Sequence, residues 1–232
     1  MTVPDVGVVI VAGGSSSRTD GDELKQFRWV AGKPMLLHSL QTFQQRADVA
    51  MVVVVLPKKF AGDPPPWLFQ CDLERMLVSV GGRERSDSVR NGLEDLGESA
   101  RIVAVHDAAR PFVPLALIDR VITEARKGHG AAPGIPVVDT IKRADESGRI
   151  LETVDRTGLW RIQTPQAFPR DLIERAHAEA RAAGVQVTDD ASLCERIGIP
   201  VVIVPGSERA MKITCEADFS RAEALSILPD DI

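Results

Sequence analysis

Short apolar runs alternate with helix-like segments along this chain, and this alternation constrains its fold more than any other feature. The clearest runs cover residues 8–12, 49–56, 76–80 and 102–105. They are rich in β-branched residues, which favour strands, and helical spacing of apolar residues follows, as in residues 35–43. Five or more such alternations predict an α/β fold, with a mostly parallel twisted sheet and helices on both faces.

The later segments continue the pattern. We expect helices at about residues 115–127, 170–183 and 216–228, a strand at 201–204 and an extended run at 211–214. A helix that ends near Leu96 is expected to start from Ser86 or Asp87, since both are good capping residues. No linker interrupts the alternation, so residues 1–232 are expected to form one domain.

A loop of small residues follows the first run. Ala12, Gly13 and Gly14 precede three serines and Arg18, and Lys25 comes seven residues later. Backbone N–H groups in such a loop can approach a polyanion closely, and the two cations add charge that suits a triphosphate. The spacing matches neither G-x-x-x-x-G-K-[ST] nor G-x-G-x-x-G. An ordinary turn that carries two basic residues is the alternative interpretation.

Two further strand ends carry polar groups. Gly82 opens a second glycine-containing junction, and Asp107 follows the fourth run, where a carboxylate is well placed to hold Mg²⁺. Ligands of parallel sheets bind outside the carboxyl ends of the strands, so these loops are predicted to converge. His106 is expected to be a buried structural residue, because adjacent side chains on a strand point to opposite faces.

Residues at about 138–160 read as a projecting β-hairpin arm that turns at Glu146-Ser147-Gly148. A two-stranded arm needs something to pack on, so we expect it to meet a second subunit. Farther along, the paired Asp189 and Asp190 are expected to cap a short helix rather than to form an acid/base dyad.

Composition excludes several classes of protein. The 232 residues include 28 basic and 33 acidic side chains, a net charge of −5 that argues against a general nucleic-acid binder. Cys71, Cys194 and Cys215 are widely separated, which predicts no disulfide framework and fits a reducing cytoplasm. No apolar run approaches the ~20 residues of a membrane span, and no signal-peptide pattern opens the sequence.

Several motifs together resemble the 2-C-methyl-D-erythritol 4-phosphate cytidylyltransferase family. They are the glycine-rich loop with its two cations, GGRERSDSV, VHDAARP, DTIKR, TVDR, MKIT, QTPQAF and TDDAS. The resemblance covers essentially the whole chain. It implies a nucleotidyltransferase, Rossmann-like fold, a homodimer formed through the arm, and an Mg²⁺-dependent reaction. In that reaction, CTP and methylerythritol 4-phosphate give the cytidine diphosphate derivative and pyrophosphate, in non-mevalonate isoprenoid synthesis.

The resemblance also implies roles for residues. Arg18 and Lys25 match the pair that stabilises the transition state, and Arg156 and Lys212 match the pair that positions the acceptor. The remaining matches are Ala12, Gly13 and Gly14 for nucleotide binding, Gly82 and Ser88 for cytosine, Asp107 for metal and sugar phosphate, and Arg110 and Thr140 for the acceptor. The arm that bears Thr140 and Arg156 is expected to reach into the partner's site.

The sequence departs from the family pattern in two places. Gly13 and Ser16 replace an alanine and a glycine of the usual Pro-Ala-Ala-Gly-x-Gly opening, and Arg83 stands where some members have aspartate. The AGGSSSR segment also resembles the corresponding loop of molybdenum-cofactor guanylyltransferases. The sequence pattern is compatible as well with a cytidylyltransferase for a polyol phosphate such as ribitol 5-phosphate, and with an inactive nucleotide-binding sensor.

Overall fold

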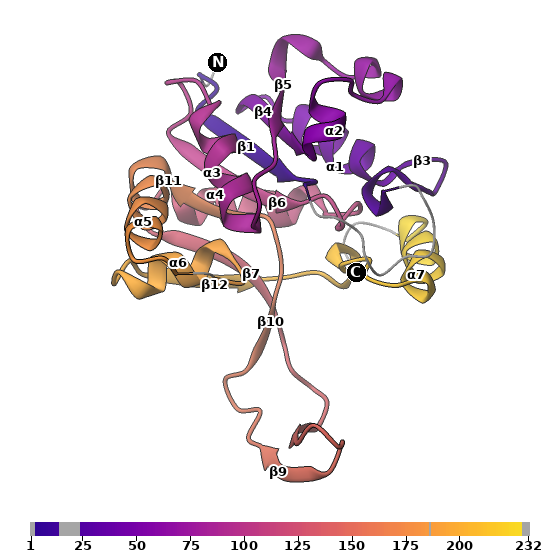
Figure 1. Ribbon diagram of the computed structural model, residues 1–232, viewed down its shortest axis with the longest axis vertical. Coiled ribbons are helices and arrows are strands. Elements are labelled where there is room, and N and C mark those ends of the chain that lie inside the picture. The colour runs from indigo at the N-terminus through magenta and orange to yellow at the C-terminus, as the bar shows by residue number, and fades with distance from the viewer. Residues whose placement is uncertain (1–2, 14–23, 186, 229–232) are drawn as a thin grey trace.

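The computed structural model describes residues 3–13, 24–185 and 187–228, and a single large sheet lies at its centre (Figure 1). The eight strands of this sheet follow the path β10-β7-β11-β6-β1-β4-β5, and β12 pairs with β7. Their bounds are β1 (Val6–Val11), β4 (Val49–Leu56), β5 (Met76–Val80), β6 (Ile102–Asp107), β7 (Gly130–Pro136), β10 (Trp160–Ile162), β11 (Gln166–Pro169) and β12 (Val201–Pro205). Two small hairpins lie outside it, β2 (Trp29–Val30) with β3 (Lys33–Pro34) and β8 (Ile141–Ala144) with β9 (Ile150–Val154).

The prediction of a mostly parallel sheet is confirmed. Strands β5, β4, β1 and β6 run parallel to one another, and β12 is parallel to β7. Strand β11 lies antiparallel between β6 and β7, and β10 is antiparallel to β7. The sequence pattern did not indicate β11, because its four residues QAFP offer no apolar run and end in proline.

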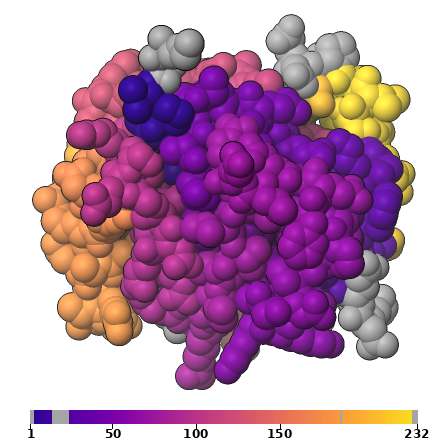
Figure 2. Space-filling view, turned by 90° about the horizontal axis from the view of Figure 1, so that it is seen from above, coloured from indigo at the N-terminus to yellow at the C-terminus, as the bar shows by residue number. Residues whose placement is uncertain are grey.

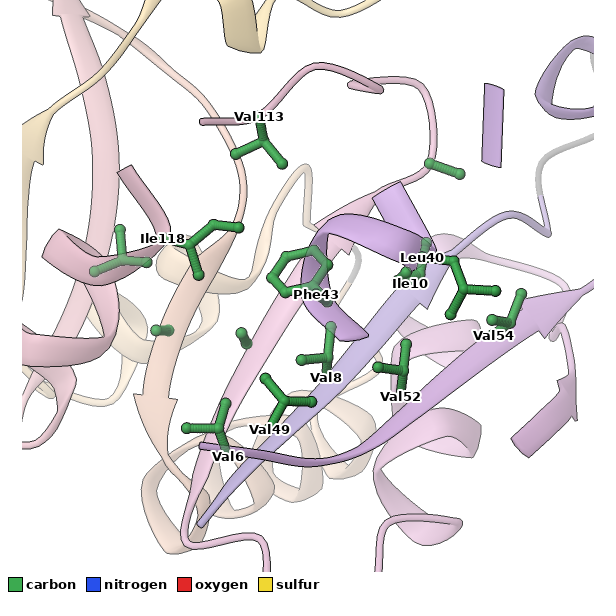
Figure 3. Packing of buried hydrophobic residues seen from close by; sticks show 14 of the residues in the cluster. Val6, Val8, Ile10, Leu40, Phe43, Val49, Val52, Val54, Val113 and Ile118 are labelled. Carbon is green, nitrogen blue, oxygen red and sulfur yellow. The ribbon is translucent and has the colours of Figure 1, made fainter. Parts of the chain in front are cut away.

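Helices cover both faces of the sheet, as predicted. They are α1 (Met35–Gln44), α2 (Lys58–Ala61), α3 (Arg85–Glu94), α4 (Leu115–Ala125), α5 (Arg170–Ala182), α6 (Asp190–Arg196) and α7 (Glu216–Ser226), with 3₁₀ turns η1 (Lys25–Phe27), η2 (Pro66–Gln70), η3 (Leu73–Arg75) and η4 (Glu208–Ala210). Alternating β1 side chains serve two cores. Val8 and Ile10 pack with Phe43 of α1 (Figure 3), whereas Val9 belongs to the cluster of Leu93 on α3.

Two expected elements differ in detail. Helix α3 begins at Arg85 after the N-cap Glu84, earlier than Ser86 or Asp87 would have started it. Asp87 lies in the first turn instead and accepts a hydrogen bond from Glu84 N at 3.2 Å. The run at 211–214 forms no strand. It meets the segment after β6, where Ile213 N donates to Ala109 O at 2.8 Å.

The β8–β9 hairpin extends away from the body as an arm (Figure 1), as the sequence predicted. In the view from above, α5 and α7 lie on opposite flanks of the body (Figure 2). None of the helices among the described residues is long and apolar enough to cross a membrane.

Candidate active site

The ends of β1 and β5 meet the start of α3 in a tightly packed junction. A Cβ on Gly13 would lie 3.2 Å from Ser88 Oγ and 3.5 Å from Gly81 Cα, and one on Gly82 would lie 2.2 Å from the Cβ of Asp87. Glycine is therefore required at position 82, because any side chain there would overlap the helix. Ser88 Oγ accepts from Gly82 N at 3.0 Å and lies 3.2 Å from Glu84 O, to which it donates.

The structure thus brings together four of the expected nucleotide-binding residues. Ala12 is buried at the end of β1, and its amide donates to Val55 O at 2.9 Å. Gly13, Gly82 and Ser88 lie at the junction beside it. Gly14 and Arg18 lie outside the described residues.

Lys25 begins the short turn η1 and reaches the C-terminal part of the chain. Its Nζ donates to Ile213 O at 2.8 Å, next to Lys212. The neighbouring Gln26 is buried and donates through Nε2 to Ala12 O at 2.5 Å. Lys25 therefore bonds to a backbone carbonyl 188 positions away, in the residue that follows Lys212. Sequence reasoning did not single out Gln26, since a glutamine in a loop carries no pattern.

Asp107 ends β6 and is held between two cations. Its Oδ2 accepts from Lys212 Nζ at 2.7 Å, and its Oδ1 lies 3.2 Å from both Nε and Nη2 of Arg85. Burial disfavours the charged carboxylate, but the positive charges of Arg85 and Lys212 outweigh burial and hold the pKa of Asp107 well below its usual range. Asp107 is therefore a permanent anion in a cationic surrounding.

Arg85 extends this chain of ion pairs to a second carboxylate. Its Nη1 lies 2.7 Å from Asp190 Oδ2, and Asp190 Oδ1 lies 3.0 Å from His177 Nε2. Burial opposes the guanidinium charge, yet the charges of Asp190 and Asp107 raise the pKa of Arg85. Sequence reasoning missed Arg85; its position within GGRERSDSV was the one available signal.

The paired aspartates divide their roles. Asp189 is the N-cap of α6, where its Oδ1 accepts from Ser192 N at 3.1 Å, so the expected capping role is confirmed for this residue. Asp190 is 1% exposed and pairs with Arg85 and His177 instead. Consecutive residues thus have different roles, since Asp189 caps the helix and Asp190 forms a buried ion pair.

Two buried polar side chains, His106 and Arg110, lie close to Asp107 in sequence. His106 is fully buried, as expected, and its ring nitrogens contact Arg110 O and Thr164 Oγ1, both at 3.2 Å. Burial lowers the pKa of His106 to about 4, so the ring is neutral at physiological pH. Arg110 is also buried and donates to Ala210 O at 2.7 Å and to Ile162 O at 3.4 Å. Arg110 thereby links the loops around the edge.

Thr140 and Arg156 belong to the arm, away from the other expected site residues (Figure 1). Both are exposed, and Arg156 Nη1 donates to the backbone carbonyl of Val138 within the arm. Within the described part of this single chain, neither side chain bonds to Asp107 or Lys212. No group of three or more His, Cys, Asp or Glu side chains arranged to hold a metal ion occurs among the described residues either.

The arrangement suits chemistry on a polyanion. The ammonium groups of Lys25 and Lys212 are bonded to Ile213 O and to Asp107, and Asp107 supplies a carboxylate at the carboxyl edge of the sheet. Preorganised cations of this kind stabilise charge that develops during phosphoryl-type transfer. Both ring nitrogens of the neutral His106 contact other groups, Arg110 O and Thr164 Oγ1. His106 is therefore not expected to transfer protons at this edge.

Comparisons with known proteins agree with this geometry. A family model described as "IspD: 2-C-methyl-D-erythritol 4-phosphate cytidylyltransferase" matches residues 6–227. The chain is 41% identical over 224 residues to the 2-C-methyl-D-erythritol 4-phosphate cytidylyltransferase of Syntrophus aciditrophicus, covering 95% of both proteins. It is 44% identical over 225 residues to a bifunctional IspD/IspF enzyme of Rhodospirillum rubrum, of which it covers 56%.

A solved structure gives the same result. The crystal structure of 2-C-methyl-D-erythritol 4-phosphate cytidylyltransferase from Thermus thermophilus matches with a TM-score of 0.80 and 34% sequence identity, over 95% of this chain and 98% of that one. The family model matches nearly the whole chain, and both of these relatives are more than 40% identical to it. This chain belongs to the IspD family of 2-C-methyl-D-erythritol 4-phosphate cytidylyltransferases.

Proposed function

We propose that this chain transfers the cytidylyl group of CTP to 2-C-methyl-D-erythritol 4-phosphate and releases pyrophosphate, a step of non-mevalonate isoprenoid synthesis. The observation that carries this proposal is that Lys25 bonds to the carbonyl of Ile213, while the adjacent Lys212 pairs with Asp107 at the carboxyl edge of the sheet. Two anionic substrates must be brought together there, and fixed cations are what such a site needs.

The chemistry is in-line attack by an acceptor phosphate oxygen on the α-phosphorus of CTP. That oxygen is already ionised in a phosphate monoester near neutral pH, because the second pKa is about 6. No general base is therefore required, and repulsion between the substrates is the main barrier. Lys25, with Arg18 from outside the described residues, would offset the charge of the triphosphate in the transition state.

The acceptor side is assigned to Lys212, Thr140 and Arg156. Lys212 pairs with Asp107 at 2.7 Å, and its side chain is 44% exposed. An exposed ammonium on a flexible stem can exchange this partner for an incoming phosphate. Arg110, which is buried and bonded to two carbonyls, would act on the acceptor by holding the loops in place.

Magnesium is the proposed cofactor, and Asp107 is the residue that would hold it. Mg²⁺ in nucleotide sites takes one or two carboxylates together with substrate phosphates. A carboxylate has about four lone-pair sites, so Asp107 keeps capacity beyond its contacts with Arg85 and Lys212. When bound, the ion would neutralise triphosphate charge.

Cytosine would be selected at the Gly82–Ser88 junction. Because the Ser88 hydroxyl already bonds to Gly82 N and Glu84 O, backbone groups of this loop are expected to read the base. A site built to pair polar groups rejects bases that leave them unpaired. Equal turnover with UTP or GTP would contradict this assignment.

We further propose that the arm forms a homodimer and carries Thr140 and Arg156 into the partner's site. Val138, Ile150 and Leu151 on the arm are 72%, 60% and 58% exposed, an apolar surface that a partner subunit would cover. Sedimentation at micromolar concentration tests this, and a monomer would refute it. The three cysteines are free thiols, which suits the reducing cytoplasm that we propose as the location.

The decisive experiment is pyrophosphate release by the purified chain with Mg²⁺ and CTP. Methylerythritol 4-phosphate and ribitol 5-phosphate are compared as acceptors, and release with the first alone is expected. Lys25→Ala should lower turnover on the order of 10²–10³-fold. Lys33→Ala is the matched control, since Lys33 is an exposed lysine that bonds only to Gln41 among the described residues. Release with ribitol 5-phosphate alone would transfer the assignment to that acceptor, and release with neither would favour a nucleotide sensor.

A further inference from the structure

Arg85 is shared between two carboxylates, one at the candidate active site and one behind it. Its Nε and Nη2 face Asp107 Oδ1, each at 3.2 Å, while its Nη1 faces Asp190 Oδ2 at 2.7 Å. The shorter contact is therefore with the carboxylate that lies farther from Lys212.

Asp190 is itself fixed from two sides. It is 1% exposed, and His177 of α5 lies 3.0 Å from its Oδ1. Its backbone N donates to Gln166 Oε1 at 3.1 Å, and Gln166 Nε2 donates to Asp189 Oδ2 at 2.7 Å. Burying a charged carboxylate is costly unless it is paired and hydrogen-bonded. Here the pairing leads through one arginine to the active-site carboxylate.

We propose that Asp190 is a positioning residue that sets the place of Asp107, and through it of Lys212, by holding Arg85. This inference rests on the proposed function, since Lys212 is assigned to the acceptor phosphate. When Asp190 is charged, the guanidinium of Arg85 contacts both Asp190 and Asp107 Oδ1. Asp107 Oδ2 is then free of Arg85 and accepts a hydrogen bond from the Lys212 ammonium at 2.7 Å.

Loss of the Asp190 charge changes this balance. Once released from Asp190, the guanidinium of Arg85 can bind both carboxylate oxygens of Asp107 through two parallel hydrogen bonds, the geometry that Arg and carboxylate prefer. Asp107 is then neutralised by Arg85, and Lys212 loses the partner that places it. The effect falls on acceptor binding, because the CTP junction at Gly13 and Gly82 is held by separate backbone contacts.

Asp190→Asn tests the inference, and Glu195→Gln is its control. Glu195 is an exposed residue of the same helix, α6, so the control removes a carboxylate from that helix while Arg85, Gln166 and His177 keep their contacts. Asp190→Asn is expected to raise the KM for methylerythritol 4-phosphate about tenfold, with the KM for CTP within about twofold. Glu195→Gln should leave both constants within about twofold.

A double-mutant cycle separates positioning from simple packing. In an Arg85→Ala background, Asp190→Asn should add less than about a twofold change, because the two residues act as one unit. Asp190→Glu, which restores the charge, should recover part of the acceptor affinity. Equal changes in both KM values, or additive effects in the cycle, would overturn the inference. If Asp190→Asn does not fold, Arg85→Lys interrupts the same link, since lysine lacks the fork.

A crystal structure of Asp190→Asn gives a readout that needs no turnover. The guanidinium of Arg85 is expected to turn toward Asp107 with Nη contacts to both carboxylate oxygens. An unmoved Arg85 would refute the positioning role even if the wild type were inactive with methylerythritol 4-phosphate. Wild-type inactivity by itself refutes only the proposed function, so the two failures are distinguishable.

Discussion

The two ends of the parallel sheet each carry a network of ion pairs, and the networks differ in kind. At the amino end, Asp5 precedes β1 and Asp48 precedes β4. Arg126 pairs with both carboxylates, and Arg46 binds Asp48 through two nitrogens at 3.0 and 3.1 Å and also pairs with Asp119. Both of these cations are arginines, whose planar guanidinium can bind fixed carboxylates through two nitrogens.

At the carboxyl end, the outer cation is Lys212, which lies on a segment without regular structure. An ammonium on a flexible stem makes a point contact that another anion can replace. Arg85 and Asp190 hold the inner part of that network rigid. We therefore propose that the same pairing chemistry stabilises the fold at one end, and that at the other end it lets Lys212 exchange its partner for a substrate.

Lys212→Ala should produce the largest effect on activity. Removing one preorganised cation is expected to lower kcat/KM on the order of 10²–10³-fold. Thermal stability should stay near the wild-type value, because an ion pair with a 44% exposed lysine contributes little to folding. Steady-state kinetics and a melting curve measure the two quantities on one preparation.

Lys127→Ala is the matched control for that substitution. Lys127 also pairs with one carboxylate, Glu124 at 2.6 Å, and is 56% exposed, but it lies outside the site. Activity should be unchanged. A comparable loss of activity in both variants would show that the carboxyl end has no special role.

Asp48→Asn should give the converse result at the amino end. The Asp48 side chain is 16% exposed and the Arg46 side chain 12%. Weakening these charged hydrogen bonds is expected to cost about 2 kcal/mol of unfolding free energy, with kcat/KM within about twofold. Denaturant titration measures the loss. Asp119→Asn, whose side chain is 62% exposed, should cost less, and an equal loss would mean that burial does not set the effect.

The sequence predicted the fold well because apolar periodicity is a local property. Residues 49–56 and 76–80 form strands with the predicted bounds. Strand β11 was missed, since its four residues, which begin with a glutamine and end with a proline, are stabilised by neighbouring strands rather than by their own pattern. The hairpin arm was found because its turn residues mark it.

The site was predicted only in part, for a related reason. Asp107 was identified because it ends a strand, and Lys25 and Lys212 because they lie in recognisable motifs. Arg85, Gln26 and Asp190 act through partners between 13 and 105 positions away. Such pairings follow from the tertiary fold, and no spacing of residues in the sequence predicts them.

Asp218→Asn asks whether the carboxyl end also contains a purely structural carboxylate. Asp218 Oδ2 accepts from Thr214 N at 2.8 Å, Thr214 Oγ1 at 2.7 Å and Cys215 N at 3.0 Å, and so fixes the turn that follows Lys212. Burial opposes its charge, but these hydrogen bonds lower the pKa of Asp218 from 3.8 to about 2. The charged form is thus the one that stabilises the fold.

The expected loss for Asp218→Asn is about 1 kcal/mol at neutral pH, as for a lost helix cap. Since the pKa is lower in the folded state, this stabilisation is complete above 3.8 and disappears as pH falls through about 2. Denaturant titrations of wild type and variant should therefore differ at pH 6 and converge toward pH 2. A pH-independent difference would mean that Asp218 acts by shape rather than by charge. The turn after Lys212 would then be held by contacts that do not depend on the charge of Asp218.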